Sequence, residues 1–96
     1  MPIFMVERRF DGDLETSAEE ADLINRINEE QGVRWLCSFL SADKRKTYCL
    51  YEAPFADAIH RAAERAGLPA DAVVEVGGMV LPDGSAAGIP NEVPAG

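Results

Sequence analysis

The chain has 96 residues, 47% of them hydrophobic and 27% charged, which is enough for one domain with a core of its own. A net charge of -8 argues against nucleic acid or an anionic membrane surface as partner, because few cations are available to meet phosphates. Two cysteines do not make a disulfide scaffold, and the N-terminal residues lack the basic flank typical of a signal peptide, so we expect a reducing cytoplasm.

Residues 2–10 are predicted to form the first strand, because apolar and other side chains alternate along them. Phe4 and Val6 then point to one face of a sheet, and Glu7 points to the other. Arg8 departs from this alternation near the end of the strand. The pattern is typical of a strand with one buried face.

Two helices are predicted, one on each side of the central hairpin. The first begins at a cap formed by Thr16 or Ser17 and continues to about Gln31. The second runs from about residue 55 or 56 to residue 66, and its inner face consists of small residues that let it lie close to a sheet. A glycine follows each helix and is the expected C-terminal stop.

The stretch from Arg34 to Pro54 is the most informative part of the chain. It predicts two strands, over residues 33–41 and 45–53, joined by a charged turn, and both faces of each strand carry apolar side chains. Such a hairpin must be covered on both faces. The helices of this chain can cover one face, so the other requires a partner chain or a ligand.

A fourth strand is predicted over residues 72–81, with Val74 and Val76 toward the helices and Glu75 away from them. The order βαββαβ predicts an α+β, ferredoxin-like fold, in which an antiparallel sheet carries two helices on one face. We expect this domain to span residues 1–81. Residues 82–96 have no periodicity and are expected to form an irregular C-terminal tail.

The register of the central hairpin decides which side chains share the bare face. One register pairs Ser41 with Lys46; the other pairs Ser41 with Thr47 and places Cys37 and Cys49 on one face. We prefer the first, because it gathers large aromatic and acidic side chains on the face away from the helices: Trp35, Phe39 and Tyr48, with Cys37, Glu7, Glu52 and Glu75.

This bare face has two functional interpretations. Aromatic side chains with a few polar groups describe a ligand pocket, which Trp35, Phe39 and Tyr48 would line. An exposed apolar patch is also typical of an interface. Both hold if two such faces meet and enclose a cavity, so we expect a homodimer that forms a dimeric α/β barrel.

The chemistry of the bare face is left open by the sequence. Glu7, Glu52 and Glu75 form either a cation-binding cluster or a set of ion pairs with neighbouring arginines. Cys37 is either a metal ligand or nucleophile, or a small buried hydrophobic residue, and nearby carboxylates would raise its pKa. No recognised catalytic motif is present, so enzyme activity is neither predicted nor excluded.

Five stretches carry a resemblance to a known family: Met-Pro-x-Phe-Met-Val-Glu-Arg at residues 1–8, Arg34-Trp35 with Ser38 and Ser41, Lys46-Thr-Tyr-Cys-Leu-Tyr-Glu-Ala-Pro54, Ala63-x-x-Ala-Gly-Leu-Pro69, and Glu75-Val76. Together they resemble the domain-of-unknown-function 4242 family of small bacterial proteins, over residues 1 to about 81. Its best-described type is a nickel-binding protein, and the resemblance implies a ferredoxin-like, usually dimeric fold. Many relatives have a histidine where this chain has Cys37, a softer ligand.

The leading hypothesis is therefore a small cytoplasmic homodimer that binds a metal, nickel by resemblance. Its candidate ligands are Cys37, Glu7, Glu52 and Glu75. The alternative is a small-molecule binding or catalytic dimeric α/β-barrel protein that uses the aromatic and carboxylate cavity, an idea that rests on fold analogy.

Overall fold

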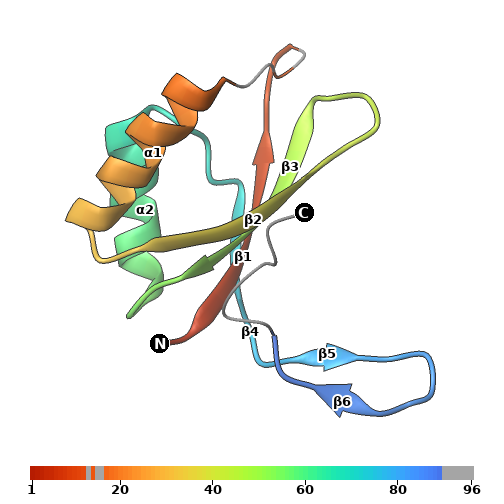
Figure 1. Ribbon diagram of the computed structural model, residues 1–96. Helices are drawn as coiled ribbons and strands as arrows, with labels where there is room; N and C mark the ends of the chain where they lie inside the picture. Colours follow the sequence, from red (N-terminus) through yellow and green to blue (C-terminus); the bar gives the residue numbers. More distant parts are fainter. Residues whose placement is uncertain (13, 15–16, 90–96) are drawn as a thin grey trace.

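A four-stranded antiparallel sheet with two helices beside it forms the body of the protein (Figure 1). The structure is a computed structural model that describes residues 1–12, 14 and 17–89. The sheet has the strand order β2-β3-β1-β4. The α+β class and the predicted βαββαβ order are confirmed by the elements β1 (Ile3–Arg9), α1 (Ala18–Glu30), β2 (Arg34–Leu40), β3 (Lys46–Glu52), α2 (Ala56–Ala66) and β4 (Ala72–Val76).

The helix boundaries follow the predicted caps. The Ser17 side chain accepts a hydrogen bond from the Glu20 backbone N–H at 3.2 Å, which satisfies one of the free donors at the start of α1. Gly32 and Gly67 follow the two helices with φ of 71° and 68°, a left-handed conformation that glycine adopts without strain. Both helices therefore end where the sequence predicts.

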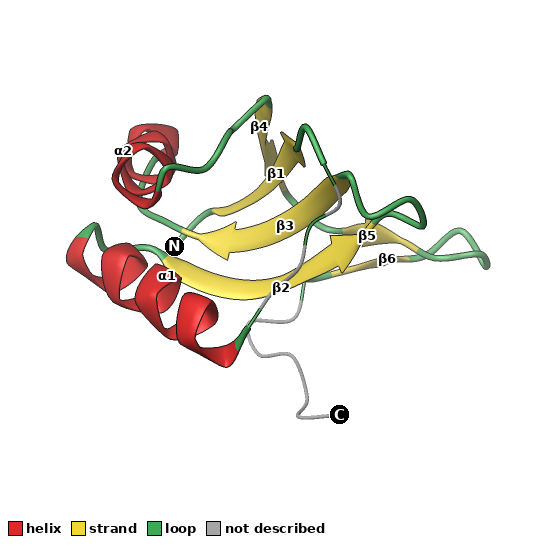
Figure 2. Ribbon diagram, turned by 90° about the horizontal axis from the view of Figure 1, so that it is seen from above, coloured by secondary structure: helices red, strands yellow, loops and turns green. Residues whose placement is uncertain are grey.

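The core lies between the sheet and the two helices (Figure 2). Phe4 and Val6 of β1 are buried there, as predicted, and the small residues of α2 let Ile59 pack against the sheet. Burial of this apolar surface is the main favourable term in folding. The buried cluster comprises Phe4, Val6, Val33, Cys49, Tyr51, Ala53, Ala58 and Ile59.

The turn of the central hairpin has the preferred register. The Ser41 backbone N–H donates to the Lys46 carbonyl at 2.9 Å, and Phe39 lies opposite Tyr48. Cys37 lies opposite Leu50, so it shares the bare face with Phe39 and Tyr48, as predicted. Since Cys49 lies opposite Ser38 on the other face, the alternative register is excluded.

A β-bulge near the start of β2 corrects the predicted position of Trp35. The pairing shifts between Trp35, which lies opposite Tyr51, and Cys37, so Leu36 is an extra residue in the strand. One extra residue reverses the alternation of side chains before it. Trp35 therefore lies on the helix face, where it packs against the core and donates from Nε1 to Ser38 Oγ at 2.8 Å.

The faces of β4 are also the reverse of those predicted. Glu75 lies opposite Phe4, and Val73 lies opposite Val6, so both belong to the helix face. Val74 lies opposite Met5 on the bare face and is 56% exposed. The sequence could not distinguish the two registers, because apolar valines occupy both faces of this strand.

A small hairpin follows the sheet and corrects the expected end of the fourth strand. The predicted fourth strand ends at Val76, and β5 (Met79–Val80) pairs with β6 (Ala86–Ala87) in a separate two-stranded sheet. β6 lies in the segment predicted to be irregular, whose residues 90–96 lie outside the described part. Both views place this hairpin on the side of the main sheet away from the helices (Figures 1 and 2). We refer to residues 79–87 as the arm.

Candidate functional site

The bare face of the sheet is mainly apolar along its centre. Phe39 is 61% exposed, and Met5, Tyr48 and Val74 are also exposed. Cys37 is half-buried among them. Of the predicted aromatic lining, Phe39 and Tyr48 are on this face and Trp35 is not. The result is a continuous apolar surface of the kind that proteins use for binding.

The predicted acid cluster is not assembled within one chain. Glu7 lies opposite Tyr48, whereas Glu52 lies opposite Ile3, at the other end of the same pair of strands. Four residues of strand separate the two positions, which corresponds to about 13 Å. Glu75 is on the opposite face of the sheet. Within the described ranges, no group of three or more His, Cys, Asp or Glu side chains is placed to hold a metal ion.

Glu7 takes part in ion pairs, one of the two alternatives that the sequence left open. Its Oε1 lies 3.4 Å from Arg9 Nε and 3.6 Å from Lys46 Nζ. All three side chains are partly exposed, so the pairs contribute little to stability. They nevertheless orient the Glu7 carboxylate at one end of the bare face.

Cys37 is held in its neutral form. Burial raises the pKa of the Cys37 thiol, and the nearby Cys49 adds to the rise. The pKa of Cys37 is therefore raised as predicted, but by burial and Cys49 and not by the neighbouring carboxylates that the sequence suggested. Because the thiolate is both the nucleophile and the metal ligand, a free Cys37 is poorly suited to either role until a metal displaces its proton.

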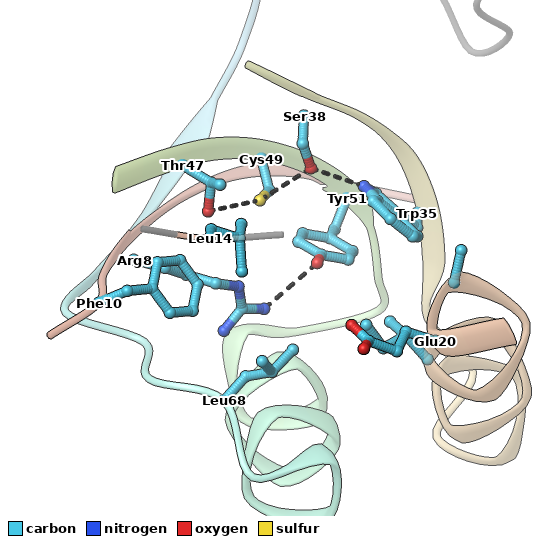
Figure 3. Close-up of a pocket in the computed structure, with 12 residues that line it drawn as sticks. Arg8, Phe10, Leu14, Glu20, Trp35, Ser38, Thr47, Cys49, Tyr51 and Leu68 are labelled. Carbon is cyan, nitrogen blue, oxygen red and sulfur yellow. Dashed lines mark hydrogen bonds between the residues drawn. The ribbon is translucent and has the colours of Figure 1, made fainter. Parts of the chain in front are cut away.

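Arg8 is the functional candidate that the sequence analysis missed. It lies on the helix face of β1 and is only 4% exposed. Its guanidinium lines a cavity between α1 and the sheet, together with Trp35 and Tyr51 (Figure 3). The signal was present in the sequence, because Arg8 occupies the inward position two residues after Val6.

None of the helices among the described residues is long and apolar enough to span a membrane. This finding concerns α1 and α2, which have 13 and 11 residues.

Comparisons with known proteins place this architecture in a family. The crystal structure of SCO4226 from Streptomyces coelicolor A3(2) is similar, with a TM-score of 0.61 and 26% sequence identity over 77% of this chain and 94% of that chain. No curated protein matches the sequence. The family model described as "Nickel responsive protein SCO4226-like" matches residues 4–76, from β1 through β4. The chain belongs to this SCO4226-like family of nickel responsive proteins.

Proposed function

We propose that this protein is a nickel-binding homodimer whose two bare sheet faces meet. The observation that carries the proposal is membership of a nickel responsive family. Nickel accepts imidazole, thiolate and carboxylate ligands, which suits Cys37 and the two glutamates of the bare face. Because one chain does not bring three such groups together in its described part, the site requires ligands from a second copy.

The exposed apolar surface supports the dimer. An antiparallel sheet with apolar side chains on both faces needs a cover on each, and the helices supply only one. The arm adds a second apolar surface on the same side, where Val80 is 83% exposed. An isolated two-stranded hairpin is marginally stable in water, so contact with a second copy would also stabilise the arm. We propose a ferredoxin-like fold assembled into a dimeric α/β barrel.

Two-fold symmetry would bring together glutamates that lie far apart within one chain. In a face-to-face dimer every residue of the bare face occurs twice, and an axis across the strands places opposite strand ends over one another. Glu7 of one copy then lies over the end of the other copy's β1, beside Glu52, with Cys37 nearer the centre along the strands. A shared site of this kind also removes the carboxylates from water, which strengthens their attraction for a cation.

Mass and metal binding can be measured together on protein purified without a histidine tag. We expect a solution mass of twice 10.4 kDa and a thermal midpoint that rises with nickel. Nickel at 100 times its Kd would add roughly 2.7 kcal/mol to the free energy of unfolding. No rise at saturating nickel, cobalt or copper would refute metal binding, and a monomer would refute the shared site.

Single substitutions test the ligands. Cys37→Ser, Glu7→Gln and Glu52→Gln should each reduce the rise in midpoint caused by nickel. Glu75→Gln is the matched control, because Glu75 lies on the helix face and is exposed. An effect at Glu75 equal to that at Glu52 would contradict the assignment to the bare face.

We propose a cytoplasmic location. Both cysteines are free, which is compatible with a reducing cytoplasm. The alternative function is the binding of a small molecule between the two bare faces, with Phe39 and Tyr48 as its aromatic lining.

A further inference from the structure

Arg8 carries a buried positive charge with incomplete hydrogen bonding. Its Nη2 donates to Tyr51 Oη at 3.2 Å, and its Nη1 donates to the Pro69 carbonyl. The guanidinium also lies over the Tyr51 ring, 5.6 Å from the centroid. Nε is buried without a partner, and no carboxylate of the described chain lies within ion-pair distance. Buried charges are normally paired, so this one requires an explanation.

The cavity beside Arg8 has a volume of about 120 Å³ and lies between α1 and the sheet (Figure 3). One wall is polar: Ser38 Oγ donates to Cys49 Sγ at 2.9 Å, and Cys49 Sγ donates to Thr47 Oγ1 at 3.4 Å. The remaining walls are mostly apolar and consist of Phe10, Leu14, Ala21, Ile24, Trp35 and Leu68. The cavity is comparable with the roughly 150 Å³ engineered cavity that takes up benzene.

Two simpler explanations for the unpaired charge of Arg8 fit less well. Water alone would meet polar partners on one wall only, whereas an ordered buried water usually makes about three hydrogen bonds. Glu20 lines the edge of the cavity, but it is exposed and forms no ion pair with Arg8. Among the described residues, neither supplies the compact negative charge that a buried guanidinium requires.

We propose that this cavity binds a small organic acid with a compact apolar body. The carboxylate pairs with the Arg8 guanidinium, at the end of the cavity where Tyr51 Oη already accepts from Nη2. The apolar body packs against Ile24 and Trp35. An arginine beside an apolar cavity is suited to this ligand. The apolar body of the acid fills the cavity and excludes water, and the hydrogen bond between the carboxylate and the guanidinium is stronger without water. This site lies on the opposite face of the sheet from the proposed nickel site and does not depend on it.

Trp35 is the single tryptophan of the chain and lines the cavity, so its fluorescence reports binding directly. Benzoate, benzamide and acetate are the probes. We expect saturable binding of benzoate, at least ~10-fold tighter than that of benzamide, because hydrogen bonds to a charged group are stronger. Acetate, which has no apolar body, should bind more weakly than benzoate. Equal binding of benzoate and benzamide, or no saturation by benzoate, would overturn the proposal.

Variants separate the site from the fold. Arg8→Gln should weaken benzoate binding by ~10- to 100-fold, but it removes a buried group and can impair folding. Ala21→Leu fills the cavity from α1 without changing Arg8 and should abolish binding, and Ala18→Leu, at an exposed position outside the cavity, is its matched control. Glu20→Gln should leave binding equal or tighter. Unchanged binding in Ala21→Leu, or lost binding in Glu20→Gln, would refute the assigned cavity.

Discussion

Replacing Tyr51 with phenylalanine tests whether the buried Arg8 depends on its phenolic partner. The substitution keeps the ring and removes only the oxygen that accepts from Arg8 Nη2 at 3.2 Å. Both residues are almost fully buried, with 3% and 4% exposed, so bulk water does not compete for this hydrogen bond. Since a hydrogen bond to a charged group contributes about 1.5–3 kcal/mol, we expect a loss of that size in the free energy of unfolding at pH 7.

The same variant should change the pH dependence of stability. Burial raises the pKa of Tyr51 above its ordinary value near 10, although Arg8 opposes the rise. Above that pH the unfolded chain loses the phenolic proton while the folded chain keeps it. The contribution of Tyr51 is therefore present below about pH 10 and decreases as the pH rises toward the folded pKa, by up to about 1.4 kcal/mol per pH unit.

Urea unfolding between pH 7 and 11 measures both effects. The Cys37→Ser background is used throughout, because the raised pKa of Cys37 produces a decrease of the same sign at lower pH. The Phe variant should be less stable at pH 7 and lose less stability between pH 10 and 11. A variant as stable as its parent at pH 7, with the same alkaline decrease, would refute the assigned role of Tyr51.

Three further substitutions and one control substitution test the fold. Ile59→Ala should cost about 2–5 kcal/mol in urea unfolding, because Ile59 is 1% exposed in the core; a loss below 1 kcal/mol would contradict its burial. Gly67→Ala should cost about 1 kcal/mol through its φ of 68°, whereas Gly12→Ala, with open space for its Cβ, should cost nothing. Gly78→Ala should speed hydrogen exchange in the arm without lowering the thermal midpoint, because its Cβ would lie 2.9 Å from the Ala87 carbonyl oxygen; unchanged exchange would refute the close approach.

The elements of the fold were predictable because local signals agreed with the hydrophobic pattern. Ser17 and Gly67 mark helix ends through backbone hydrogen bonding and conformation, which depend on a few neighbouring residues. The turn register was predicted from the side chains that it gathers on one face, and in the structure Asp43 fixes the loop by accepting from Ser41 Oγ and from the Arg45 backbone N–H. Interactions between residues that are close in sequence can therefore be predicted from the local sequence.

The composition of the site was less predictable, because it depends on the alternation of side chains over long distances. A single extra residue, Leu36, moves Trp35 to the other face, and nothing in an apolar strand marks where a bulge will occur. The adjacent valines of β4 fit either face equally well, so Glu75 was placed with the other acids. Both incorrect predictions assign side chains to the wrong face of the sheet, although the strands themselves are predicted correctly.

The alternation of side chains along β1 explains how the two faces of one small sheet can carry two proposed sites, one for a cation and one for an anion. Glu7 and Arg8 are neighbours in sequence, yet Glu7 lies on the bare face and Arg8 lies in the helix-side cavity. Cys37 and Cys49 are divided by the sheet in the same way. In the two proposals, a cation binds the carboxylates of the bare face and an organic anion binds the buried guanidinium on the other side of the sheet. The two proposed sites can therefore be tested independently, because a substitution on one face removes no side chain from the other.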